Sequence, residues 1–325
     1  MDAQPVDSHP YSRLTPDLVL DGVAAAGLRP DGRLLSLNSY ENRVYQVWLE
    51  DDTVVVAKFY RPGRWTDAQI DEEHAFAHEL AEREIPIVAP THSLRFSNFR
   101  IAIYPRRGGR TPELGDERTL EWIGRFIGRI HAVGATQPFK HREALTPKTF
   151  GHDARAFLLS TKFIPADLLD PWKAAAQQAL AGIDRCFVGG HTTIRLHGDC
   201  HVGNVLWTED GPHFVDLDDA RMGPAMQDLW MLLSGDRAAM SRQLRVVLNG
   251  YEEFAEFDRR ELRLLEALRT LRLLHYSAWI ARRWDDPAFP AAFPWFNTQR
   301  YWQDRILELR EQIALMEEEP LETAA

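Results

Sequence analysis

The chain has 325 residues, 45% of them hydrophobic and 26% charged, a composition that excludes collagen-like, low-complexity and disordered proteins. Lysine and arginine total 38 against 48 aspartates and glutamates, and the resulting net charge of −10 disfavours nucleic acid and anionic membranes as partners. Two cysteines are too few for a disulfide framework, and no four-ligand zinc spacing is present.

No targeting or membrane-spanning segment is evident in the sequence. Residues 1–5 lack a basic stretch followed by an apolar one. No apolar run approaches the roughly 20 residues of a membrane helix. We therefore expect a soluble, cytoplasmic protein, and because no self-association stripe is evident we expect a monomer.

The first third of the chain has the pattern of a mixed α/β unit. Thr15 and Pro16 suit the start of a short helix. Period-two runs of β-branched and aromatic residues follow, which is typical of strands joined by tight turns. The elements expected in chain order are a helix at 15–27, a strand meander over 34–60, a helix at 66–83, an extended connector at 85–90 and a strand at 100–104.

The pattern changes at residues 105–109, where proline and two glycines interrupt the chain. Beyond them the spacing is mostly helical, with short strands only between residues 191 and 216. Helices are expected at 120–133, 153–159, 171–186, 226–233, 241–257, 259–283 and near 300–315. We predict an α+β, two-lobed protein with a cleft, in which residues 1–104 form a small nucleotide-binding N-lobe and residues 105–325 a larger, mostly helical lobe for catalysis and acceptor binding.

Three polar residues near the predicted cleft carry the most evident chemistry. Asp199 and Asn204 lie five residues apart in a loop, and Asp216 follows the next strands. Mg²⁺ prefers oxygen ligands and keeps positions for water and substrate phosphates, so Asn204 and Asp216 fit a metal pair. Asp199 is then available to orient or deprotonate a hydroxyl nucleophile.

This pattern resembles the signature of the aminoglycoside-phosphotransferase and choline-kinase-like branch of the protein-kinase-like fold. The resemblance implies that Asp199 is the catalytic base and that Asn204 and Asp216 hold Mg²⁺, with Asp216 also counted as catalytic. The two histidines of the signature are expected to hold the loop by hydrogen bonds. The matching residues are His197, Gly198, Asp199, His201, Asn204 and Asp216.

Lys58 follows a run of four strand residues and resembles the kinase lysine that contacts the α- and β-phosphates of ATP. Such a lysine pairs with a carboxylate of the following helix. Glu73 is the preferred partner from its spacing to the connector, and Glu72 is the alternative, since neighbours on a helix point about 100° apart. Lys58 and Glu73 are therefore expected at the nucleotide site.

The expected phosphate loop, residues 37–45, contains no glycine. We expect its backbone amides and the Ser39 hydroxyl to contact phosphate, helped by Asn42 or Arg43. Nothing in the sequence resembles an activation segment, so switching by phosphorylation of such a segment is not expected. Cys200, next to the expected base, leaves a redox-sensing role open, although a small buried loop residue is the favoured interpretation.

Several blocks of sequence further resemble the bacterial stress response kinase A family. The blocks are residues 37–46, 58–62, 64–66, 214–221, 227–233 and 286–290. The resemblance implies an ATP-dependent, non-specific serine/threonine protein kinase of envelope and oxidative stress. Its expected partners are proteins that bear serine or threonine, and whether the chain is its own substrate is left open. A small-molecule hydroxyl kinase of the aminoglycoside, choline or homoserine type is the alternative. A nucleotide-binding pseudokinase is disfavoured by the complete set of signature residues.

Overall fold

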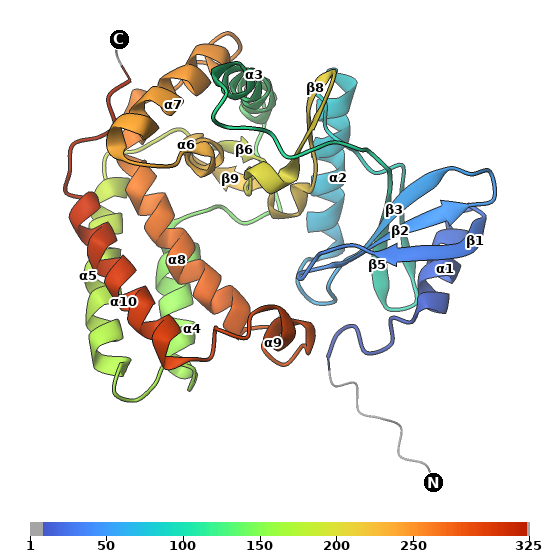
Figure 1. The fold of residues 1–325 in the computed structure, drawn as a ribbon, viewed down its shortest axis with the longest axis horizontal. Coiled ribbons are helices and arrows are strands. Elements are labelled where there is room, and N and C mark those ends of the chain that lie inside the picture. The colour runs from blue at the N-terminus through green and yellow to red at the C-terminus, as the bar shows by residue number, and fades with distance from the viewer. Residues whose placement is uncertain (1–8, 324–325) are drawn as a thin grey trace.

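The protein folds into two lobes of unequal size (Figure 1). The structure, a computed structural model, describes residues 9–323, so the expectation about residues 1–5 falls outside the described part. The smaller lobe is built on one β-sheet and the larger lobe is mostly helical. The α+β, two-lobed architecture predicted from the sequence is therefore confirmed.

One antiparallel sheet forms the centre of the small lobe. Its strands, in the spatial order β1-β2-β3-β5-β4, are β1 Pro30–Ser36, β2 Arg43–Leu49, β3 Val54–Phe59, β5 Phe99–Pro105 and β4 His92–Phe96. Successive side chains of a strand point to opposite faces. Ala57 and Phe59 of β3 belong to one apolar cluster, and Lys58 between them points to the other face. Lys58 stands opposite Val44 on β2 and Ala102 on β5.

Two helices flank this sheet, α1 (Pro16–Ala25) and α2 (Asp67–Glu82). The N-cap hydroxyl of Thr15 begins α1, and a reciprocal capping box between Thr66 and Gln69 begins α2. The apolar side of α1 packs on the sheet face that holds Phe59. In Figure 1, α2 lies between the sheet and the large lobe, so its buried residues can reach both.

Helices dominate the large lobe. They are α3 Glu117–Gly134, α4 Asp153–Ser160, α5 Leu169–Phe187, α6 Met226–Leu229, α7 Arg237–Tyr251, α8 Leu265–Ala281, α9 Ala288–Ala292 and α10 Gln299–Leu315. Two strand pairs lie among them, β6 (Ile194–Leu196) with β9 (Arg221–Gly223) and β7 (Val205–Thr208) with β8 (Gly211–Phe214). The loops after β6 and β8 face the small lobe and carry the signature residues.

The connector before β4 joins the lobes through backbone hydrogen bonds. The amide of Val88 donates to the carbonyl of Phe214 (3.0 Å), and the amide of Phe214 donates to the carbonyl of Pro86 (2.8 Å). Phe214 is the last residue of β8, two positions before Asp216. The end of this strand is therefore fixed against the small lobe.

Most predicted elements are present. The differences lie where long-range contacts determine whether a helix or strand forms and where it ends. Strands β4 and β9 and the short helix α9 were not predicted, because none has a strong local pattern. Residues 241–257 were expected to be one helix, but α7 ends at Tyr251. The helix expected at 259–283 begins as a 3₁₀ turn, Arg259–Leu264, before α8.

Strand β5 ends at Pro105, next to the boundary expected between residues 104 and 105. The assignment of nucleotide binding to one side of it and acceptor binding to the other stays a proposal. Over residues 9–323, no helix has both the length and the apolar character that crossing a membrane requires.

Helices α3 and α7 approach so closely that only glycine fits between them. A Cβ atom on Gly124 would lie 2.1 Å from the carbonyl oxygen of Val247. We expect Gly124→Ala to lower the free energy of unfolding by about 1–3 kcal/mol or more, because two backbones must move apart. Denaturant unfolding measures this, and Gly108→Ala, whose Cβ would meet nothing within 4 Å, is the control. Equal stability of the two variants would contradict this packing.

Candidate active site

A cleft of about 760 Å³ lies between the lobes and is lined by all of the signature residues except His197. Its small-lobe wall comes from the loop between β1 and β2 and from Lys58. Its large-lobe wall comes from the loops after β6 and β8 and from α8. The predicted site residues that line it are Ser39, Lys58, Asp199, Asn204 and Asp216.

The ammonium group of Lys58 is buried among three carboxylates. Its Nζ lies 3.3 Å from Glu73 Oε1, 3.1 Å from Asp216 Oδ1 and 3.2 Å from Asp218 Oδ1. Burial alone would lower the pKa of Lys58, but the charges of Asp218, Glu73 and Asp216 outweigh it and hold the pKa well above its usual value. Lys58 therefore carries its positive charge in this site.

The two carboxylates that the sequence left open have different partners. Glu73 pairs with Lys58 and also accepts a hydrogen bond from Tyr60 (2.9 Å). The carboxylate of Glu72 instead accepts from the backbone amides of residues 140–142, at 2.6–2.9 Å. The helix turns them to different sides, so Glu73 is the residue in contact with Lys58.

Arg142 was not predicted, yet it links the two walls of the cleft. Its Nη2 donates to Glu73 Oε2 (2.9 Å), and its Nη1 donates to the backbone carbonyls of Asp218 (2.5 Å) and Ala220 (3.2 Å). The side chain is fully buried. Arg142 thus holds α2 against the loop that follows β8.

Asp199 lies after β6 with one carboxylate oxygen bound to a cation. Arg272 Nη1, from α8, donates to Asp199 Oδ1 (2.7 Å), and His201 Nε2 lies 3.4 Å from Oδ2. Burial raises the pKa of Asp199, but His201 and Arg272 outweigh it, so the pKa lies well below its ordinary range. Asp199 is therefore a carboxylate at neutral pH.

The loop around Asp199 is positioned by Asp228, a buried residue of α6. Its carboxylate accepts from the backbone amides of His197 (2.8 Å) and Gly198 (2.9 Å), and from His131 Nε2 (3.0 Å). Gly198 has φ +87°, and a Cβ there would lie 2.1 Å from the carbonyl oxygen of Asp219. Only glycine fits this position.

The two signature histidines also support the loop. His197 is buried, and its Nε2 lies 2.9 Å from the carbonyl oxygen of Val215. His201 Nδ1 accepts from the amide of Gly203 at 2.9 Å. Each ring makes the kind of loop-holding hydrogen bond that was expected from the sequence.

Asn204 and Asp216 offer oxygen atoms at the cleft floor. The amide nitrogen of Asn204 donates to the carbonyl oxygen of Asp199 (3.0 Å), which leaves its side-chain oxygen as an acceptor. Asp216 is half-exposed and has φ 61°, a left-handed conformation that aspartate tolerates better than most residues. An amide oxygen beside a carboxylate suits Mg²⁺, so this donor set fits the metal that the sequence suggested.

The glycine-free loop before β2 is held by the large lobe. Glu41 accepts from Trp279 Nε1 (2.5 Å) and from Arg283 Nη2 (2.6 Å), both near the end of α8. The Ser39 hydroxyl donates to the carbonyl oxygen of Asn42 (3.2 Å) at the rim of the cleft. The loop keeps its shape through side-chain contacts in place of glycine flexibility.

The expectation that Arg43 could contact phosphate is wrong. Its guanidinium donates to both carboxylate oxygens of Asp286, at 2.9 and 2.8 Å, and does not line the cleft. The side-chain oxygen of Asn42 is likewise engaged, with the amide of Arg61 (3.1 Å). A local motif could not reveal these partners, because Asp286 lies 243 residues away from Arg43.

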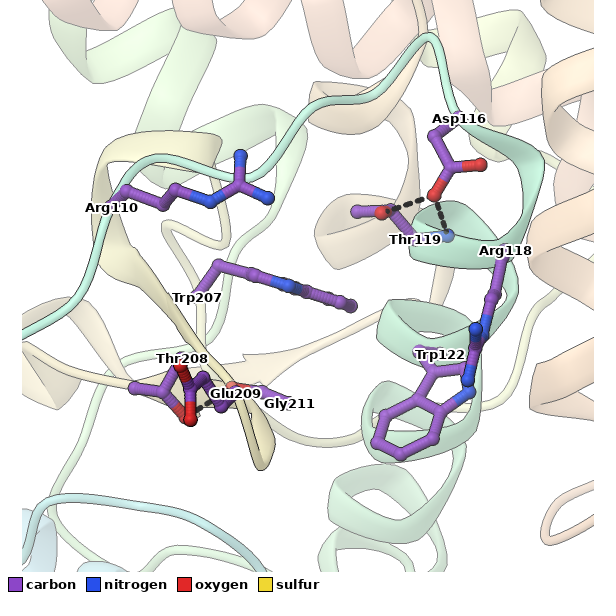
Figure 2. A pocket seen from close by; sticks show the side chains of 9 residues that line it. All are labelled: Arg110, Asp116, Arg118, Thr119, Trp122, Trp207, Thr208, Glu209 and Gly211. Carbon is purple, nitrogen blue, oxygen red and sulfur yellow. Dashed lines mark hydrogen bonds between the residues drawn. The ribbon is translucent and has the colours of Figure 1, made fainter.

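A second pocket, of about 540 Å³, lies between the β7–β8 hairpin and the start of α3 (Figure 2). Trp122 and Trp207 form part of its wall, with ring centroids 6.4 Å apart. Asp116 there caps α3 by accepting from Thr119. None of the signature residues lines this pocket, so the chemistry belongs to the cleft.

Cys200 does not suit a redox sensor. The residue is 1% exposed, and burial raises the pKa of its thiol well above the usual value, with Asp228 and Asp199 adding to the effect. A reactive cysteine needs an accessible thiolate. The favoured interpretation, a small buried loop residue, agrees with this environment.

Comparison with known proteins agrees with the geometry. Residues 33–265 match the model of the phosphotransferase enzyme family, APH. Stress response kinase A of Escherichia coli (strain K12) is 44% identical over 317 residues, 96% of each chain. The chain belongs to the stress response kinase A group of this phosphotransferase family. Another relative, named serine/threonine protein kinase RdoA, from Salmonella typhimurium, is 43% identical over the same share of both chains.

Solved structures show the phosphotransferase fold over nearly the whole chain. Amicoumacin kinase hAmiN, in complex with AMP-PNP, Ca²⁺ and Ami, has a TM-score of 0.70 at 17% identity and covers 92% of both chains. Spectinomycin phosphotransferase APH(9)-Ia, with ADP and spectinomycin, has a TM-score of 0.65 at 16% identity and covers 96% of this chain and 99% of that one. At these identities the likeness is one of fold.

Glu261 ties the positioning helix α6 to the rest of the lobe and is expected to make stability depend on pH. Its carboxylate accepts from the amide of Met226 (3.0 Å), and burial raises its pKa from 4.5 to about 7. A carboxylate whose pKa is higher in the folded than in the unfolded state stabilises the fold at pH values below its unfolded pKa. This stabilisation is lost as the pH rises through the folded pKa.

Relative to Glu261→Gln, the wild type should therefore become less stable between about pH 4.5 and pH 7. Denaturant midpoints across this range measure the difference. The exposed Glu256 provides a control, Glu256→Gln, which should keep the wild-type pH dependence. Parallel curves for the wild type and Glu261→Gln would contradict the expectation.

Proposed function

We propose that the chain is an ATP-dependent serine/threonine protein kinase that transfers the γ-phosphoryl group of ATP to protein hydroxyls. The observation that carries this proposal is the presence of Lys58, Asp199, Asn204 and Asp216 in one cleft. These are the residue types that phosphoryl transfer needs for positioning and for charge neutralisation. The names of the relatives at 43–44% identity support the protein acceptor and the stress-response setting.

In this proposal the small lobe holds the nucleotide. Lys58, kept charged by its carboxylates, neutralises the α- and β-phosphates, and Glu73 keeps its Nζ at the sheet surface. The Ser39 hydroxyl and the backbone amides of its loop donate hydrogen bonds to the phosphates. Because the loop is tied to α8 through Glu41, it covers the phosphates without needing glycine.

Asn204 and Asp216 would hold Mg²⁺ through the oxygens described above. Held there, the ion would supply positive charge that offsets the negative charge of the phosphates during transfer. Asp216 also contacts Lys58, so its carboxylate would serve both the ammonium group of Lys58 and the magnesium ion.

Asp199 would orient the acceptor hydroxyl. The oxygen of the acceptor hydroxyl attacks the γ-phosphorus. The bond from that phosphorus to the bridging oxygen breaks, and ADP leaves. Because the pKa of Asp199 is low, it is a weak base and takes the proton late, when the hydroxyl has become acidic in the loose transition state. Arg272 keeps the carboxylate in one orientation during this step.

The acceptor side of the cleft favours an acceptor without high positive charge. Arg272 lies beside Asp199, and Arg221 lines the same cleft. These cations would repel a polyamine such as an aminoglycoside. The alternative, a small-molecule hydroxyl kinase, is kept because structural neighbours of the same fold are named as kinases of amicoumacin, spectinomycin and aminopropanol.

An acceptor panel tests the proposal. Labelled ATP is offered with a generic protein substrate, with the chain alone, and with an aminoglycoside, choline and homoserine. We expect transfer to protein serine and threonine, and Asp199→Asn should lower it by about 10²–10⁴-fold while nucleotide binding remains. The control Asp210→Asn, in an exposed turn, should keep full activity. Transfer to a small molecule alone would establish the alternative, and an active Asp199→Asn would contradict the assigned role.

The metal assignment is tested by binding. Mn²⁺ is titrated in the presence of AMP-PNP and followed by electron paramagnetic resonance. Because Asp216 would supply a charged oxygen, Asp216→Asn should weaken Mn²⁺ binding by about tenfold or more. Asp210→Asn should bind Mn²⁺ as the wild type does. Unchanged binding by Asp216→Asn would remove that residue from the proposed metal pair.

A further inference from the structure

A third hollow, of about 700 Å³, lies outside the nucleotide cleft. It forms where the first described residues, the loop after β3 and the end of α8 come together. We call it the arginine groove, and its arginines are Arg13, Arg61, Arg64, Arg282 and Arg283. Among the described residues that line it, the acidic ones are Asp285 and Asp286. Five arginines and two acidic residues thus line the groove, and Glu41, Asp218 and Asp219 behind it pair with Arg61, Arg64 and Arg283.

The two acidic residues that line the groove do not neutralise its arginines. Asp286 is buried and already binds Arg61 (2.6 Å) as well as Arg43 outside the groove (2.8 Å). Arg282 is exposed, its guanidinium makes no hydrogen bond to any residue in the described range, and it rests on the ring of Phe157 with its Cζ 4.6 Å from the centroid. Its guanidinium donors are therefore open to a ligand.

Arg283 adds a second sign of incomplete pairing. Its Nη2 binds Glu41 and its Nη1 donates to the carbonyl of Trp279, but its buried Nε has no hydrogen-bond partner among the described residues. Burial lowers the pKa of Arg283, and the charges of Arg64 and Arg61 lower it further against the opposite effect of Glu41. An anion in the groove would relieve this repulsion.

The groove is connected to the nucleotide cleft through shared side chains. Arg64 lines both hollows, and its guanidinium binds the carboxylates of Asp218 and Asp219. Arg61 and Arg283 both bind Glu41, in the loop expected to cover the phosphates. A ligand that binds these arginines would therefore affect both Asp218 and Asp219 and the loop that carries Glu41.

We propose that the arginine groove is a regulatory site for a phosphoryl anion, separate from the ATP site. Phosphate oxygens accept paired hydrogen bonds from guanidinium groups, and a cluster of arginines binds them more tightly than a single one. Bound there, the anion competes with Asp218, Asp219 and Glu41 for their arginines and loosens the phosphate loop. Free phosphate and a phosphoserine segment share this chemistry.

Binding is measured by calorimetry with the cleft saturated by AMP-PNP and metal, so the result does not depend on kinase activity. The probes are inorganic phosphate, a phosphoserine peptide and the same peptide unphosphorylated. We expect the phosphorylated probes to bind, and Arg282→Glu to weaken them by about tenfold or more. Arg242→Glu, on an exposed turn of α7, is the matched control and should bind as the wild type does. Tighter binding of the peptide identifies a phosphorylated segment as the ligand, and equal binding identifies free phosphate.

Arg13→Glu, at the other end of the groove, gives a second variant with the same expected loss if Arg282→Glu folds poorly. The bound probe should also raise the KM for ATP by about twofold or more in the wild type and leave it unchanged in Arg282→Glu. Loss of all phosphate binding when AMP-PNP fills the cleft would overturn the site. Binding without a change in KM would overturn its regulatory role.

Discussion

The structure depends on one buried cation, the ammonium group of Lys58, and on the carboxylates that surround it. Lys58 comes from the sheet, Glu73 from α2, and Asp216 and Asp218 from the large lobe. A buried charge is tolerated only with its partners, and removing one of them typically costs 3–5 kcal/mol. The same four groups thus join three separate elements and prepare the cleft for phosphate. Stability and chemistry at this point cannot be varied independently.

The sequence was enough to predict the two lobes, most helices and the residues that line the cleft. Asp199, Asn204 and Asp216 were found because they fall within two linked motifs, and Lys58 because it follows a run of strand residues. Arg142, Asp228 and Arg272 were missed as supporting residues. Arg142 and Arg272 lie outside the motif, and the role of Asp228 depends on tertiary contact with residues about 30 and 97 positions away. The signals available for Asp228 were its position beside an apolar run and its place in the block 227–233.

Elements without a strong local pattern were the ones that escaped prediction. Strand β4 has no β-branched residue and exists because β5 offers it an open edge. Helix α9 lies at the end of α8 nearest the small lobe (Figure 1), in a segment rich in proline and aromatic residues. Its neighbour Asp286 binds arginines of the small lobe, so that segment is ordered by charge pairing across the lobes.

The attachment of the phosphate loop to α8 has a consequence for the order of events in turnover. A glycine-rich loop lifts by rotating its own backbone, whereas this loop can lift only if Glu41 leaves both Trp279 and Arg283. If this loop covers the phosphates, exchange of ADP for ATP would require these two charge-assisted contacts to break. We therefore expect nucleotide exchange to depend on side chains of the opposite lobe, Trp279 and Arg283.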